Sequence, residues 1–281
     1  MPTIPEPIKA LANKTLGAAA HKFVDFLVRK YTGKSVEAFK AEGEVEANKI
    51  RTSWEEVEKP LWLQMETVRL QRQYENFREI IEKSAPHIIA DANQIENDND
   101  FFWGLIEHAK DVSNVEMQEL ISKILAGEYN APGTYSMSTL QILKSLGKTD
   151  LEVFSTYGTL YINRIGFIRA VFSMNEPELE LRKALNLDYP DFLELQNLGL
   201  IQSGSLTGNF KFSSLSSLEF SYGNKQFKMS IDSGEEKWRI PPCYELTKAG
   251  KEILPFLKIQ THPLFEEWLC EFFIKEGFTV H

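Results

Sequence analysis

Cysteines and long apolar runs are scarce in this sequence, and each scarcity excludes a class of protein. The 281 residues include two cysteines, Cys243 and Cys270, which cannot form a disulfide framework, so a reducing, cytoplasmic environment is expected. The least polar early stretch, residues 16–28, is interrupted by polar side chains and is shorter than the ~20 apolar residues of a membrane-spanning helix. The opening residues have no basic region followed by an uninterrupted apolar core, so no secretory signal is predicted.

Recognisable catalytic motifs are also missing. The sequence contains no phosphate-binding loop, no dinucleotide-binding glycine turn and no nucleophile elbow. Gly33–Ser35 and Gly147–Thr149 resemble the end of a phosphate loop but lack its upstream glycine. The five histidines include no pair at i, i+4, and the cysteines form no CxxC motif. We therefore expect a protein that is not an enzyme and that needs no cofactor and no metal.

Basic residues are outnumbered, since 31 Lys and Arg face 40 Asp and Glu, for a net charge of −9. Only the first 33 residues have a basic excess, with five basic and two acidic side chains. A domain that binds DNA tightly by itself usually carries a basic excess, so autonomous DNA binding is disfavoured.

Residues 16–30 predict an amphipathic helix that packs on the rest of the protein; a helix that binds a membrane or a partner is the alternative.

Changes in composition and breaker residues divide the chain into four predicted regions. Pro60 is expected to open a helix and Pro86 to limit it, within a stretch too charged to form a core alone. That stretch is therefore expected to pack on the next domain or on a second copy of the chain. The regions are an N-terminal amphipathic helix (1–33), long charged helices (34–100), a helical core (101–174), and a winged-helix-like α+β unit with a C-terminal helix (175–281).

Capping signals define the helices of the predicted core. Ser113–Glu116 is a predicted capping box at the start of a helix, and Gly127 is predicted to end that helix. Residues 149–152 form a second predicted capping box, at the start of a later helix. A further helix is predicted to carry Arg164 and Arg169. Together these signals favour a core built from helices alone.

Short strands replace long helices after about residue 175. Pro190 is expected to begin a short helix that Gly199 ends, and Asn224 lies in a predicted hairpin turn. Thr247 is predicted to cap a following helix. A helix, a small antiparallel sheet and a further helix in this order are typical of a winged helix. The predicted fold class is mainly α with a C-terminal α+β winged-helix-like unit.

The segment from Val112 to Leu146 resembles the core of a bacterial family, domain of unknown function 2806. Upstream, residues 41–50 and 72–88 also fit the family, as do LQNLGLI and YELTKAGKEI downstream. Ile121 departs from the pattern, since relatives often carry an aromatic residue there. In the order of its elements the chain is also similar to abortive-infection alpha-type proteins. The resemblance implies a prophage or phage-defence setting and no particular activity. The residues that match are Glu116, Met117, Gln118, Glu119, Leu120, Ile124, Leu125, Ala126, Gly127, Glu128, Pro132, Gly133, Ser136, Thr139 and Leu140.

Two residues of that segment are candidate partner contacts, Glu128 and Ser136. The alternative for Glu128 is structural, with its carboxylate accepting hydrogen bonds that fix the following turn. A second candidate set consists of basic residues in the later part of the chain, which could contact nucleic acid although carboxylates crowd the same region. These residues are Arg164, Arg169, Lys211, Lys225, Lys228 and Arg239.

The preferred functional prediction is a non-enzymatic interaction or sensing component of a bacterial phage-defence or prophage-associated system. A protein partner or a homo-oligomer formed through the long charged helices is expected. One alternative is a nucleic-acid-binding regulator that uses the winged-helix-like unit. The other is a membrane-acting effector that uses the N-terminal helix, although membrane contact is disfavoured.

Overall fold

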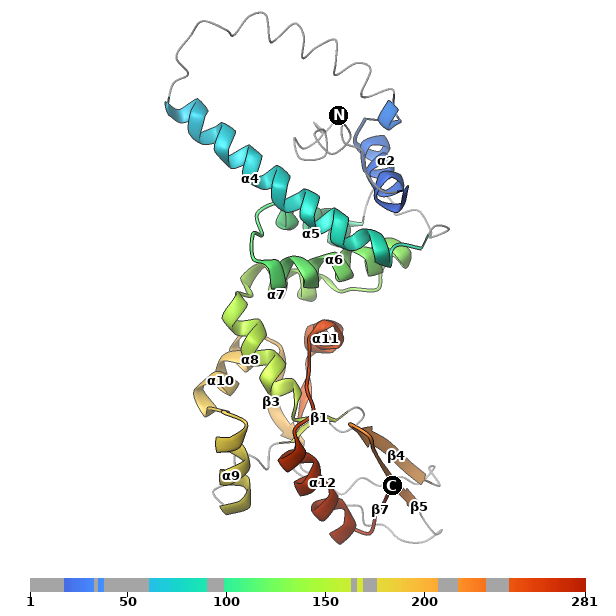
Figure 1. Cartoon of the computed structure of the whole chain (residues 1–281), viewed down its shortest axis with the longest axis vertical. Coiled ribbons are helices and arrows are strands. Elements are labelled where there is room, and N and C mark those ends of the chain that lie inside the picture. The colour runs from blue at the N-terminus through green and yellow to red at the C-terminus, as the bar shows by residue number, and fades with distance from the viewer. Residues whose placement is uncertain are drawn as a thin grey trace, which may run out of the picture. The chain divides into compact units, whose positions relative to one another are not determined.

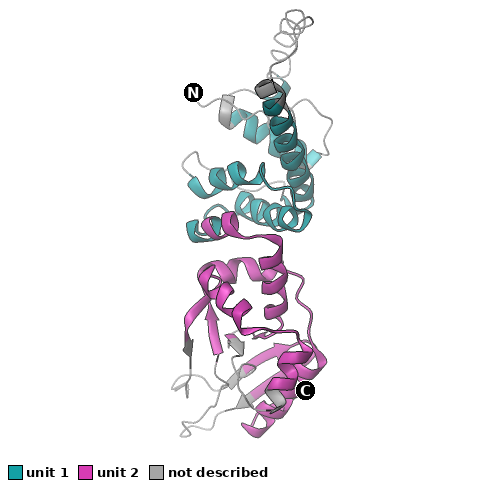
Figure 2. Cartoon of the chain, turned by 90° about the vertical axis from the view of Figure 1, so that its left-hand side faces the viewer, with its two compact units in different colours: residues 1–140 teal, residues 141–281 magenta. Residues whose placement is uncertain are grey.

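The computed structural model describes residues 18–32, 35–37, 61–89, 99–162, 166–168, 176–206, 217–230 and 243–281 (Figure 1). These residues are mostly helical, with small antiparallel sheets in the C-terminal part, as the sequence predicts. The chain forms two compact units, Met1–Leu140 and Gln141–His281 (Figure 2). None of the described helices is long and apolar enough to cross a membrane.

The first unit contains helices and no strands among its described residues. Its elements are α2 (Ala18–Thr32), α4 (Leu61–Ser84), the 3₁₀ turn η1 (Ala85–His87), α5 (Asp100–Ala109), α6 (Val115–Asn130) and the start of α7 (Met137–Ser145). The apolar face of α2 is buried, and Phe23 lies edge-on to both Phe102 of α5 and Tyr129 of α6. The prediction that the first helix packs on the rest of the protein is therefore confirmed.

Helix α4 packs on α6 through its C-terminal half, where Phe77, Ile80 and Ile81 are fully buried. The helix ends at Ser84 and Pro86 occupies the following 3₁₀ turn, as predicted. The N-terminal half of α4 extends away from α5 and α6 (Figure 1). Its side chains at Met65 and Val68 are 65% and 68% exposed.

The second unit contains a four-stranded antiparallel sheet in the order β1-β2-β6-β3. The strands are β1 (Tyr161–Ile162), β2 (Gly166–Ile168), β3 (Ile201–Leu206) and β6 (Cys243–Leu246), and the helices around them are α8 (Lys148–Gly158), α9 (Glu176–Ala184), α10 (Tyr189–Asn197) and α11 (Lys248–Ile253). Phe192 of α10 lies against Tyr157 of α8 and Tyr244 of β6. These rings join the helices to the sheet.

A second, three-stranded sheet has the order β4-β5-β7, with strands Ser217–Tyr222, Lys225–Ser230 and Thr279–Val280. The hairpin turn predicted at Asn224 is confirmed: Tyr222 pairs with Lys225, and Gly223 between the strands has φ +56°. Helix α12 (Pro263–Lys275) covers one face of this sheet, where Phe273 contacts Phe220 and Phe227. The alternation of the strands leaves their polar residues on the other face.

Predictions at Pro190 and Thr247 are confirmed. Pro190 lies in the first turn of α10, and the Thr247 hydroxyl accepts the Gly250 N–H at the start of α11.

The helix predicted through Arg164 and Arg169 is wrong, because residues 161–162 and 166–168 are strands. Apolar and aromatic residues favour a strand there once β6 offers a pairing edge.

Three capping predictions are also wrong. The cap of α6 is Asn114 rather than Ser113, and that of α8 is Gly147, whose N–H donates to the Asp150 carboxylate. Helix α6 continues past Gly127 to Asn130. At Gly127 an added Cβ would lie 2.4 Å from the Tyr135 hydroxyl oxygen, so the glycine serves a close approach and not a helix end.

Candidate functional site

The loop after α6 is organised by the carboxylate of Glu128, which is fully buried. Its Oε1 accepts from Asn99 Nδ2 at 2.7 Å and from the Gly133 N–H at 2.7 Å. Its Oε2 accepts from the Tyr135 N–H at 3.2 Å. Because Asn99 also accepts the Phe102 N–H at the start of α5, Glu128 ties the beginning of α5 to the loop.

Ser136 follows this loop directly, at the start of α7. Its hydroxyl oxygen lies 2.8 Å from the Ser138 hydroxyl and 3.0 Å from the Thr139 hydroxyl, and its carbonyl accepts the Thr139 N–H. Glu128 reaches the neighbouring Tyr135 N–H instead of Ser136. The two candidates therefore shape the same loop, Glu128 from inside and Ser136 from its partly exposed end.

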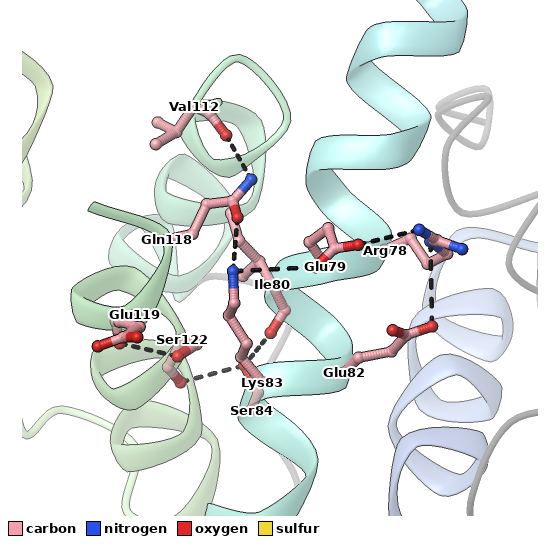
Figure 3. Close-up of polar contacts among 10 residues, drawn as sticks. All are labelled: Arg78, Glu79, Ile80, Glu82, Lys83, Ser84, Val112, Gln118, Glu119 and Ser122. Atoms are coloured by element: carbon pink, nitrogen blue, oxygen red, sulfur yellow. Dashed lines mark hydrogen bonds and ion pairs between the residues drawn. The ribbon is translucent and has the colours of Figure 1, made fainter. Parts of the chain in front are cut away.

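A row of buried polar side chains, which we call the polar seam, runs between α4 and α6, and Figure 3 shows its part around Ser84, Gln118 and Ser122. In its lower part, Ser84 Oγ lies 2.7 Å from the Ile80 carbonyl oxygen and 3.1 Å from the Ser122 carbonyl oxygen. Above it, Gln118 donates to the Val112 carbonyl at 3.0 Å and accepts from Lys83 Nζ at 2.7 Å. The members of the polar seam, each at most 6% exposed, are Gln73, Asn76, Ser84, Gln118 and Ser122.

The upper end of the polar seam reaches the turn between α5 and α6. Gln73 Nε2 donates to the Asp111 carboxylate at 2.7 Å. Asn76 Nδ2 donates to the Lys110 carbonyl and to the Ser113 hydroxyl, both at 3.0 Å. Ser113 is therefore an acceptor for α4 and not the cap of α6. Buried amides with satisfied hydrogen bonds fix one register between two helices, because a slip would leave them unpaired.

Sequence reasoning missed the polar seam. The signal was present, since Gln73, Asn76, Ile80 and Ser84 recur at helical spacing along one face of α4. Their burial depends on α6, which supplies the matching carbonyls and amides and which sequence periodicity does not identify.

Only two of the six basic residues predicted to contact nucleic acid are described, Lys225 and Lys228; Arg164, Arg169, Lys211 and Arg239 lie outside the described residues. Lys228 forms an ion pair with Glu219 at 2.5 Å on the paired strand. Lys225 lines a groove of about 380 Å³ together with Glu266 and Glu267. Lys225 and Lys228 therefore both lie near carboxylates.

Burial raises the pKa values of both cysteine thiols in the second unit. Burial, with Glu245 nearby, raises the pKa of the Cys243 thiol to about 11. Burial also raises the pKa of Cys270, while Lys225 opposes this shift. Both shifts favour the unreactive thiol. Within the described residues, no cluster of His, Cys, Asp and Glu could hold a metal ion.

Two helices expose apolar side chains beside charged ones. On α4, Met65 and Val68 lie near charges of both signs, Glu66, Arg69, Arg72 and Glu75. On α10, Tyr189, Leu193 and Glu194 are exposed, and Tyr189 also stacks on the buried Phe192. The exposed fractions of Tyr189 and Leu193 are 47% and 40%.

Comparison with known proteins gives one family. The model of the family described as "Protein of unknown function (DUF2806)" matches residues 64–270, a range that includes most of α4, the polar seam, the Glu128 loop and α10. No curated protein matches the chain significantly, and no solved structure does so.

Proposed function

The chain belongs to the family of proteins of unknown function DUF2806, and we propose that it acts without catalysis, as an interaction or sensing component that associates with further copies of itself. We place it in the bacterial cytoplasm, in a phage-defence or prophage-associated system. That setting rests on the family resemblance alone and awaits a phage-plating assay.

The observation that carries self-association is the exposed pair Met65 and Val68 on α4. They lie one turn apart on the N-terminal half of the helix, which extends beyond the part packed on α6 (Figure 1). Burying such a pair in an interface contributes about 1.5–3 kcal/mol for each side chain. The polar seam holds α4 in one register, so this pair is presented in a fixed direction.

Native mass tests this proposal. The chain at micromolar concentration is expected to run at a multiple of 32.3 kDa, and the variant with Met65→Ser and Val68→Ser is expected to run as a monomer. Val115→Ser removes an apolar side chain of similar exposure from α6 and should leave the mass unchanged. A monomeric parent chain would contradict self-association. Hydrolysis of nucleotides or nucleic acid by the purified chain would contradict a non-catalytic role.

A nucleic-acid-binding regulator is the second candidate, supported by the order of elements in the second unit. Helix α10 is followed by β3, the hairpin β4–β5 and β6, which is the order of a winged helix with an enlarged wing. The negative charge of α10 opposes this candidate, because Asp188, Asp191 and Glu194 lie on or beside the helix that would enter a DNA groove. Binding to duplex DNA that weakens steeply with salt would support it over the first proposal.

Membrane action by the N-terminal helix has less support. Phe23, Val24, Leu27 and Val28 of α2 are buried inside the first unit, so membrane contact would require α2 to leave its place. Sedimentation with anionic liposomes, lost on deletion of residues 8–31, would support the membrane alternative.

A further inference from the structure

We draw no further inference here: the strongest candidate, the exposed surface patch of α10 formed by Tyr189, Leu193 and Glu194, is small because Tyr189 already stacks on Phe192, and nothing in the described part of the chain shows what covers it.

Discussion

Replacing Glu128 tests whether one buried carboxylate organises the loop after α6. Glu128→Ala removes the acceptor of three hydrogen bonds, from Asn99, Gly133 and Tyr135, while the side chain it replaces is fully buried. A buried donor left unpaired costs about 1–3 kcal/mol, and bonds to charged groups lie at the upper end of the net range. Because the loop residues are partly exposed, their N–H groups can regain water as the loop relaxes.

We therefore expect Glu128→Ala to lower the free energy of unfolding of the first unit by about 2–4 kcal/mol. Glu128→Gln keeps one acceptor oxygen but turns an NH₂ group towards a donor, and about 1–2 kcal/mol is expected. Glu116→Gln, on the exposed first turn of the same helix, is the matched control and should change stability by less than about 0.5 kcal/mol.

Urea denaturation followed by circular dichroism gives these values, and amide hydrogen exchange locates the change. Faster exchange at Gly133 and Tyr135 is expected in both Glu128 variants. If Glu128→Ala proves as stable as Glu116→Gln, or if exchange in the loop does not change, the reasoning from this carboxylate is refuted. Unchanged stability with lost self-association would instead favour Glu128 as a partner contact.

Two further predictions concern the second unit. Gly250→Ala is expected to destabilise it by about 1–3 kcal/mol, because the added Cβ would lie 2.1 Å from the Leu200 carbonyl oxygen; Gly204→Ala, with open space around the Cβ, is the control in thermal unfolding. Cys270 is expected to react with a thiol reagent at pH 8 before Cys243 does, because Cys243 is 1% exposed and burial holds its pKa at about 11. Equal rates in the folded chain, measured by mass spectrometry, would contradict this order, whereas equal rates in denaturant are expected.

Local chemistry made much of the fold predictable. Pro86, Pro190 and Thr247 act at the places where the sequence puts them, because their effects depend on their own backbone and nearest neighbours. The hairpin turn at Gly223 was predictable for the same reason.

Competition between neighbouring residues limited the prediction of helix ends. Ser113 and Asn114 can both cap a helix, and Asn114 does so because Asn76 of α4 engages the Ser113 hydroxyl. At residues 166–168, a strand forms because β6 lies beside them, a partner more than 70 residues away in sequence. Tertiary contacts decided both cases, and they are invisible to local patterns.

The same limit applies to the candidate site. Glu128 could be singled out because it follows a glycine inside a motif, but its burial depends on Asn99 from another helix. The apolar residues of α4 and α10 recur at helical spacing in the sequence. Which side of each helix remains exposed became clear only when the buried side was known.

The polar seam gives α4 a property that an apolar interface would lack. Apolar helix faces tolerate small rotations and shifts, since hydrophobic contact has little directionality. Gln73 and Asn76 of α4 reach the turn before α6, and Lys83 of α4 reaches Gln118, only when α4 lies in one register, so a slip would leave the buried amides of Gln73 and Asn76 unpaired. The exposed N-terminal half of α4 is a continuation of the same helix. A register fixed at the polar seam therefore also fixes the direction in which Met65 and Val68 project from α4, and the proposed self-association depends on that direction.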